Sequence, residues 1–375
     1  MMTQPFVFGI PASGPHFIGR EKEIDHLSSN FRYGINTVLM SPRRWGKTSL
    51  VNHVADNMEK EDNLIIIRMD IFACRSEYDF YNTFCSEILR QSSTKVEEWT
   101  ELAKGFIERL IPKISVKPDQ TQEYAISLGI TPKTHSPKEV LTLPQKIAEK
   151  KKCRLIICID EFQQIGEFPS SLEVQKKLRG EWQNQKNVTY CLYGSKMHMM
   201  RELFQKKSHP FYKFGEVLNL SPIPLEKWTP YIKGRFSSFG KSIDDKTIRL
   251  ICDIADYQAS YVQQLAYAAF LYTDKIATQE TANLALEEVI GQNIGIFIEQ
   301  TKTLTTYQIN FLRAILDGVT EGFGEAEIRD NYNLGSPSNI PRLKKALVDK
   351  EIIEQTEKGF IIGDPILKLW LKRII

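Results

Sequence analysis

The sequence predicts an α/β protein in which a doubly wound parallel sheet is followed by a helical domain and a winged helix-turn-helix. Three observations lead to this fold class. Within 1–224, five short apolar runs of strand length are separated by segments with helical spacing. Residues 225–295 show helical spacing throughout and no clear strand. Residues 307–363 give three short helical segments and then a hairpin, the order of a winged helix. We therefore expect domain boundaries near 1–224, 225–300 and 301–375.

The five apolar runs have the length of strands and end in polar residues. The run at 64–67 is a continuous Leu-Ile-Ile-Ile, which is typical of a central parallel strand covered on both faces. The runs lie at 37–40, 64–67, 154–161, 188–193 and 217–220. In such sheets ligands bind at the carboxyl ends of the strands. Four polar residues fall at these ends: Ser41, Asp160, Glu161 and Ser195.

The segments between the strands mostly have helical spacing. A helix that ends near Gly34 and Asn36 is expected before the first strand, and another is expected directly after Lys47. Two more amphipathic helices are expected around 77–91 and 95–111. Residues 1–16 are rich in Gly and Pro and are expected to form an extended arm.

One segment breaks this rhythm. Residues 113–130 alternate apolar and polar side chains on either side of a polar turn, which predicts an inserted antiparallel hairpin. Ser136 and Pro137 have the residue types of an N-cap and a first helical position. Pro144 lies inside the helix that follows, so we expect a kink or a late start there.

The composition is that of an ordinary globular protein, with 42% hydrophobic and 25% charged residues. A formal net charge of +3 does not by itself indicate nucleic acid or membrane. The six cysteines are scattered and mostly lie in apolar runs, so buried reduced thiols are expected rather than disulfides or metal ligands. No apolar run has the length of a membrane span, and the first residues lack a signal-peptide pattern. We expect a cytoplasmic protein without a membrane partner.

The first strand leads into a loop that ends in Gly-Lys-Thr, the closing half of a phosphate-binding P-loop. Gly46 would let the backbone approach phosphate, Lys47 would reach the β- and γ-phosphates, and Thr48 would place its hydroxyl on Mg²⁺. The N–H groups at the start of the next helix would face the same anion. The candidate ATP-binding residues of the loop are Ser41, Pro42, Arg43, Arg44, Trp45, Gly46, Lys47, Thr48 and Ser49.

Four positions of this loop allow alternative interpretations. Ser41 stands where the pattern has its first glycine, and a serine is compatible with that turn if its φ is negative. Arg43 and Arg44 could contact phosphate or could form ion pairs with acidic residues of the protein. Trp45 is bulky for such a loop and could cover the nucleotide or pack on the sheet.

A second motif lies more than a hundred residues later, where Asp160 and Glu161 end an apolar strand. In P-loop ATPases an acid at this position holds Mg²⁺ together with the P-loop hydroxyl, here that of Thr48. The next acid can act as general base towards the attacking water. Ser195, at the end of another strand, could orient that water or sense the γ-phosphate. The structural alternatives are a strand-capping Asp-Glu pair and a turn serine.

Four segments occur in the order found in one family. They are Phe-Ile-Gly-Arg-Glu at 17–21, the P-loop segment at 41–50, Ile-Asp-Glu-Phe-Gln at 159–163 and Tyr-Gly-Ser at 193–195. With them, the chain resembles the archaeal-type ATPases of the AAA+ superfamily, close to the STAND signalling class. Residues 364–370 resemble the end of the winged-helix domain that such proteins often carry.

The resemblance implies a P-loop NTPase core, a helical lid and a winged helix-turn-helix domain. It implies that Lys47 and Thr48 contact phosphate and Mg²⁺, and that Asp160 is the second protein ligand of the metal. It assigns Glu161 as the catalytic base and Ser195 as sensor 1. The segment at 17–21 would lie near the adenine and ribose, which adds three binding residues: Ile18, Gly19 and Arg20.

The C-terminal segment 301–375 has two possible partners. Its candidate recognition helix, at about 338–350, carries Arg342, Lys344 and Lys345, but acidic residues follow closely. The helix could therefore bind double-stranded DNA, or the domain could serve as a protein-docking or autoinhibitory module. We expect a Mg²⁺-dependent ATPase that works as a molecular switch. The alternatives are a DNA-binding regulator with a structural or slowly hydrolysing nucleotide site, and an interaction scaffold.

Overall fold

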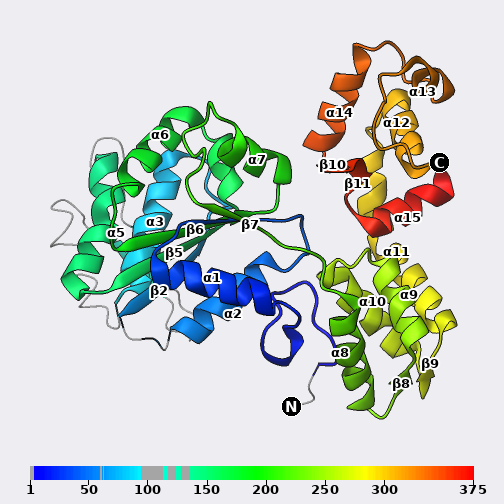
Figure 1. Ribbon diagram of the computed structural model, residues 1–375, viewed down its shortest axis with the longest axis horizontal. Helices are drawn as coiled ribbons and strands as arrows, with labels where there is room; N and C mark the ends of the chain where they lie inside the picture. The colour runs from blue at the N-terminus through cyan, green and yellow to red at the C-terminus, as the bar shows by residue number, and fades with distance from the viewer. Residues whose placement is uncertain (1–3, 60, 62, 94–112, 117–123, 128–135) are drawn as a thin grey trace. The chain divides into compact units, whose positions relative to one another are not determined.

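The computed structural model describes residues 4–59, 61, 63–93, 113–116, 124–127 and 136–375 (Figure 1). The chain divides into two compact units. We call residues 20–41 and 47–220 the core unit, and residues 1–19, 42–46 and 221–375 the C-terminal unit. The boundaries proposed from the sequence, at 224 and 300, subdivide the chain more finely and stay a proposal.

The core unit contains a five-stranded sheet in which all neighbouring strands are parallel. The strand order is β2-β5-β6-β1-β7. The strands are β1 (Thr37–Met40), β2 (Leu64–Asp70), β5 (Arg154–Asp160), β6 (Val188–Gly194) and β7 (Glu216–Asn219). Each expected apolar run forms one of these strands, which confirms the predicted α/β class.

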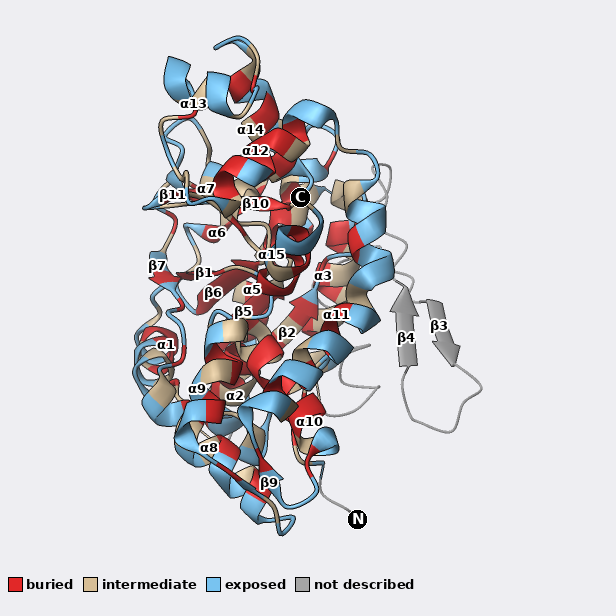
Figure 2. Cartoon of the chain, turned by 90° about the vertical axis from the view of Figure 1, so that its right-hand side faces the viewer, coloured by how far each residue is buried: buried red, intermediate tan, exposed pale blue. Residues whose placement is uncertain are grey.

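Helices cover both faces of this sheet (Figure 1). They are α1 (Glu21–Tyr33), α2 (Lys47–Met58), α3 (Glu77–Gln91), α5 (Pro137–Lys151), α6 (Ser171–Trp182) and α7 (Met197–Gln205), with the short 3₁₀ helix η2 (Phe162–Glu167). Leu155, Ile157 and Ile159 of β5 are buried in one apolar cluster with side chains of α3, α5 and α6. Every residue of β1 and β6 is buried, and Figure 2 shows these strands in red. Burial on both faces explains why these runs are continuously apolar rather than alternating.

Two sequence-based expectations in the core unit have definite outcomes. The inserted hairpin is confirmed, since β3 (Lys113–Val116) and β4 (Tyr124–Ser127) pair antiparallel. Of the kink or late start expected for α5, the late start is wrong, while the kink stays a prediction. The helix begins at Pro137 because Ser136 and Glu139 form a capping box that fixes its first turn, and it continues through Pro144. The helix expected at 95–111 lies outside the described residues.

The C-terminal unit is mainly helical and ends in a winged helix. Its elements are η1 (Gly14–His16), α8 (Leu225–Ser237), β8 (Ser242–Ile243), α9 (Asp245–Ile254), α10 (Ala259–Tyr272), β9 (Ile276–Ala277), α11 (Gln279–Thr301), α12 (Thr306–Leu316), α13 (Ala326–Asn331), α14 (Asn339–Asp349), β10 (Ile353–Thr356), β11 (Gly359–Ile362) and α15 (Pro365–Ile374). The expected hairpin is confirmed as the antiparallel pair of β10 and β11, with Ile353 opposite Ile362. The segment at 225–295 is not free of strands, because β8 and β9 form a two-residue parallel pair. Such a short pair leaves no period-two pattern in the sequence.

The N-terminal arm is part of the C-terminal unit's core. Phe6 is fully buried, and its ring lies edge-on to those of Tyr231, Phe236 and Phe270. The backbone N–H of Val7 donates to the side chain of Gln263, which lies in α10. The arm therefore fixes α8 and α10 to each other.

The six cysteines are buried as free thiols, which confirms the expectation from their apolar surroundings. Among the described residues, no helix combines the length and the apolar character needed to cross a membrane.

Candidate functional site

Three neighbouring strands of the core unit bring the candidate residues to one edge of the sheet. In the order β5-β6-β1, the middle strand β6 ends at Gly194, which lies opposite Met40 at the end of β1. All three strands run parallel, so their carboxyl ends share one edge. Ser195 therefore follows the strand between the one that precedes Ser41 and the one that ends at Asp160.

The P-loop hydroxyl and the strand-terminal acid are in direct contact. Thr48 Oγ1 donates a hydrogen bond of 2.7 Å to Asp160 Oδ2. The other oxygen of Asp160 accepts the backbone N–H of Glu161 at 2.8 Å. Burial raises the pKa of Asp160 to about 6, against the opposing effect of these hydrogen bonds and with a smaller raising effect from Glu161 and Asp70. The site thus contains a partly buried carboxylate whose charged form a nearby positive charge would stabilise.

This donor set fits Mg²⁺. A hydroxyl and a carboxylate are hard oxygen ligands, and Mg²⁺ usually keeps several waters and binds substrate phosphates beside one or two protein carboxylates. Among the described residues, no group of three or more His, Cys, Asp or Glu side chains is arranged to hold a metal. Thr48 and Asp160 would accordingly hold Mg²⁺ only together with nucleotide phosphates and water.

The conformation of the P-loop answers the question raised by Ser41. Ser41 does not adopt a positive φ, so its side chain is compatible with the turn. The left-handed positions are Arg44, with φ 68°, and Gly46, with φ 88°. Lys47 is only 6% exposed, and its Nζ donates to the carbonyl oxygen of Ser41 at 2.6 Å. This hydrogen bond ties the two ends of the loop together.

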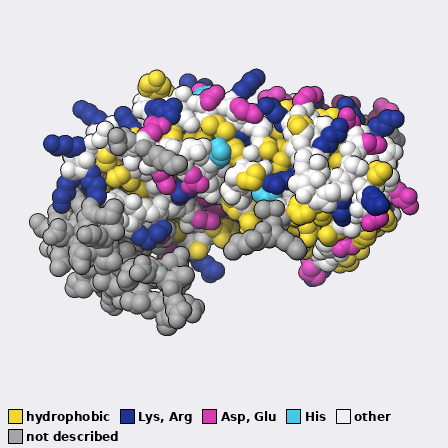
Figure 3. Space-filling model, turned by 90° about the horizontal axis from the view of Figure 1, so that it is seen from below, with side chains coloured by type: hydrophobic (Ala, Val, Ile, Leu, Met, Phe, Trp, Pro, Cys, Tyr) yellow, Lys and Arg dark blue, Asp and Glu magenta, His cyan; other side chains and the backbone are white. Residues whose placement is uncertain are grey.

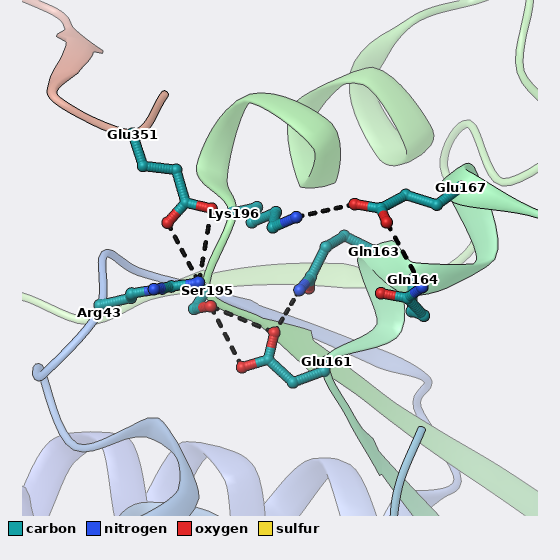
Figure 4. Close-up of polar contacts among 8 residues, drawn as sticks. All are labelled: Arg43, Glu161, Gln163, Gln164, Glu167, Ser195, Lys196 and Glu351. Carbon is teal, nitrogen blue, oxygen red and sulfur yellow. Dashed lines mark hydrogen bonds and ion pairs between the residues drawn. The ribbon is translucent and has the colours of Figure 1, made fainter. Parts of the chain in front are cut away.

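Glu161 stands in a left-handed conformation, with φ 53° and ψ 37°, directly before η2. Its carboxylate accepts hydrogen bonds from Ser195 Oγ, at 3.1 Å to Oε1, and from the side-chain amide of Gln163 (Figure 4). The structure therefore brings together two of the residues chosen from the sequence and a third that was not chosen. Gln163 belongs to the Ile-Asp-Glu-Phe-Gln segment, but a glutamine two residues after an acid has no distinctive spacing.

The two arginines of the loop form ion pairs within the C-terminal unit. Arg43 pairs with Glu351 at 3.1 Å, and Arg44 pairs with Asp364 at 2.6 Å (Figure 4 for Arg43). The Arg44 guanidinium also lies over the Tyr261 ring, 4.3 Å from its centroid. Of the two interpretations of these arginines, the structure places them on acidic residues of the protein.

The other candidate binding residues lie in packed positions. Ile18 packs against the apolar cluster of the C-terminal unit, and Gly19 has φ 67°. A Cβ atom at Gly19 would lie 2.7 Å from Ile223, so only glycine fits there. Arg20 is 3% exposed and pairs with Glu23 at the start of α1. In the loop, Ser49 is buried while Pro42 and Trp45 are half-buried. Their contribution to nucleotide binding stays a proposal.

Comparisons with known proteins agree with this geometry. The model of the KAP family P-loop domain matches residues 45–166, and a model described as a probable winged helix domain matches residues 295–373. A comparison with the sequences of curated proteins gives no match.

Three solved structures share the fold. The Walker-type ATPase of Pyrococcus abyssi is 18% identical, with a TM-score of 0.70 over 98% of this chain and 100% of that chain. The ORC2 protein of Aeropyrum pernix, in ADPNP-ADP complexes, is 15% identical, with a TM-score of 0.55 over 95% and 93% of the two chains. The ORC1 protein of Aeropyrum pernix, in complex with DNA, is 13% identical, with a TM-score of 0.51 over 95% and 93%. Together with the two family models, these neighbours confirm the resemblance to archaeal-type P-loop ATPases that end in a winged helix.

Proposed function

We propose that this chain, which has a P-loop NTPase domain and a C-terminal winged helix, binds and hydrolyses Mg·ATP and acts as a switch of the AAA+/STAND type. The observation that carries the proposal is the hydrogen bond from Thr48 to Asp160. It brings together two motifs that are 112 residues apart, as the proposed Mg²⁺-binding pair requires. Either motif alone has an ordinary structural explanation. That explanation does not account for their contact at the carboxyl edge of a parallel sheet, where ligands bind in folds of this kind.

In this proposal each side chain of the edge has one task. Lys47 leaves the Ser41 carbonyl and neutralises the β- and γ-phosphates. Thr48 and Asp160 hold Mg²⁺, which supplies charge stabilisation on the phosphates. Glu161 accepts a proton from a water whose oxygen bonds to the γ-phosphorus, the bond to the β-phosphate oxygen breaks, and ADP and phosphate are released. Ser195 orients the Glu161 carboxylate for this proton transfer.

The proposed switch rests on the arginines of the P-loop. Three residues of the C-terminal unit contact Arg44. Its guanidinium pairs with Asp364 and lies over the ring of Tyr261, and its carbonyl oxygen accepts the N–H of Ser260 at 3.1 Å. Asp364 also caps α15 by accepting the N–H groups of Ile366 and Leu367. A loop that moves to bind phosphate must disturb these contacts, so nucleotide and winged helix would compete for one loop conformation.

The substitution Asp364→Asn is expected to tighten ATP binding about 3- to 5-fold, because it removes an ion pair worth up to about 1 kcal/mol that restrains the loop. Asparagine still caps a helix well, so α15 keeps its N-terminus. Equilibrium titration with a fluorescent ATP analogue measures the change. Glu287→Gln is the matched control, since Glu287 pairs with Arg373 of α15 and contacts no P-loop residue. Unchanged or weaker binding in Asp364→Asn would contradict the restraint.

The proposed activity itself is tested by phosphate release from ATP, with Mg²⁺ and with EDTA. We expect turnover that requires Mg²⁺, measured with and without double-stranded DNA. A wild-type chain that binds no ATP under either condition would overturn the proposed function.

Binding of double-stranded DNA is the second candidate function. The observation in its favour is α14, where Arg342 and Lys345 are exposed, together with the DNA-bound ORC1 protein among the structural neighbours. Lys344 is not counted among these basic residues, because its ammonium lies over the rings of Phe323 and Phe360. On the face that Figure 3 shows, which is seen from below, basic and acidic side chains are interspersed. At α14 itself, Asp349 and Glu351 follow the basic residues closely, so phosphate neutralisation there would be modest.

If α14 binds DNA, the double variant Arg342→Ala/Lys345→Ala should weaken duplex binding and lower the slope of log K against log salt by about 2, or about 1 per lost phosphate contact. Fluorescence anisotropy at several salt concentrations gives this slope. Exposed Lys207, in the core unit, supplies the control variant Lys207→Ala. A wild-type chain without salt-dependent binding at low ionic strength would favour a protein partner for the winged helix.

A further inference from the structure

The carboxylate of Glu161 is held by two neutral donors of the core unit. Ser195 Oγ lies 3.1 Å from Oε1 and 3.2 Å from Oε2. The Nε2 group of Gln163 donates to Oε2 from the same loop (Figure 4). The proposed function gives Ser195 a task, but it leaves Gln163 without one.

Gln163 is an unusual residue for its position. Its side chain is 1% exposed, and its Oε1 accepts no hydrogen bond from the described residues. A buried amide that satisfies only its donor side is costly, and a leucine there would bury the same volume without that cost. The amide must face Glu161 through its nitrogen, since the reversed amide would direct its oxygen at a carboxylate.

The surrounding residues hold this amide in place. A Cβ atom at Gly194 would lie 1.8 Å from Gln163 Oε1, although Gly194 does not have a positive φ. An alanine at position 194 would therefore displace the Gln163 amide, and this constraint comes from the neighbouring side chain and not from the backbone of Gly194. Phe162, the first residue of η2, lies between Glu161 and Gln163 in the sequence, and its buried ring packs against those of Phe204 and Phe211.

We propose that Gln163 is a positioning residue that, with Ser195, fixes the Glu161 carboxylate in the orientation needed to accept a proton from the attacking water. This inference rests on the proposed function and deepens it. Glu161 stands in a left-handed conformation, and its carboxylate is contacted by the hydroxyl of Ser195 and the amide of Gln163. Two donors occupy two of its roughly four lone-pair directions and leave the remaining ones for water.

The test compares Gln163→Leu and Gly194→Ala with the wild-type chain. Leucine removes the donor at similar volume, whereas alanine at 194 displaces an amide that is still present. Both variants are expected to lower kcat about 10-fold or more with KM changed less than about 2-fold, since small misplacements of a catalytic group have effects of this size. Gly180→Ala in α6 is the control, because a Cβ atom there meets nothing within 4 Å.

Two further measurements separate positioning from packing. Gln163→Leu should melt at the wild-type temperature or above it, because it removes a buried unpaired oxygen, while a packing role predicts a lower melting temperature. In a Glu161→Gln background, Gln163→Leu should have no further effect on kcat, since the residue acts through Glu161.

The outcomes distinguish this inference from the function on which it rests. A wild-type chain without Mg²⁺-dependent turnover overturns both. Turnover that Glu161→Gln abolishes and Gln163→Leu leaves unchanged overturns the inference alone. A rise of kcat in Gln163→Leu also overturns it, since the amide would then restrain Glu161 instead of placing it for catalysis.

Discussion

Replacing Lys47 by alanine is expected to weaken ATP binding about 100-fold or more, because charge-assisted hydrogen bonds contribute roughly 1.5–3 kcal/mol each and Lys47 would make them to two phosphates. The lysine is buried, and its Nζ lies at the start of α2, where the helix N-terminus adds further positive potential. Isothermal titration calorimetry with ATP and Mg²⁺ measures the loss.

The same substitution should leave the fold intact. The ammonium of Lys47 donates to the carbonyl oxygen of Ser41, but burying its charge is itself unfavourable. A melting temperature within a few degrees of wild type therefore accompanies the loss of binding. Lys207→Ala, at an exposed position, serves as the control for the loss of one positive charge. If Lys47→Ala binds ATP as tightly as wild type, the nucleotide site is not at this loop.

The parts of the fold that were predictable are those with a strong local pattern. The strands β1, β5 and β6 are buried throughout or nearly so, so each shows as an apolar run that ends at a polar residue. The capping box at Ser136 and the winged hairpin are equally local. The pair of β8 and β9 is two residues long, and so short a strand has no period to detect.

The candidate site was predictable only in part, because some of its contacts join residues that are far apart in the sequence. The tasks proposed for Lys47, Thr48 and Asp160 rest on which residue types suit phosphate and Mg²⁺ at fixed places on a strand and a helix. The partners of Arg43 and Arg44 lie 308 and 320 residues further along the chain, and no local spacing connects them. Their ion pairs depend on tertiary packing of the C-terminal unit.

In this P-loop, the positions that adopt a positive φ differ from the position where the sequence pattern has its first glycine. The pattern places a glycine at position 41, but the chain adopts its positive φ values at Arg44 and Gly46. Arg44 accepts this cost, and its guanidinium and carbonyl groups are both held by neighbours. The serine at 41 therefore does not by itself impair phosphate binding. What distinguishes this loop is that its middle is tied to residues of the winged helix.

The substitution Glu161→Gln is expected to preserve ATP binding and to lower turnover by about 10²- to 10⁴-fold, the range that general base catalysis supplies. Glutamine has nearly the shape of glutamate, and its amide oxygen can still accept the hydrogen bond from Ser195. It cannot take up the proton of the attacking water. Thr48 and Asp160 are unchanged, so Mg·ATP affinity should stay within about 2-fold of wild type, a difference of roughly 0.4 kcal/mol.

Single-turnover phosphate release, measured beside equilibrium ATP binding, separates this effect from a loss of affinity. Glu167→Gln is the control, because Glu167 ends η2, the 3₁₀ helix that follows Glu161, and pairs with Lys196 near the surface. It should turn over ATP at the wild-type rate. Weak binding in Glu161→Gln would mean that Glu161 holds the metal or the nucleotide. Wild-type turnover in that variant would instead mean that water is activated without this carboxylate, by another group or by the phosphate itself, and the hydrogen bonds from Ser195 and Gln163 would then have only a structural role.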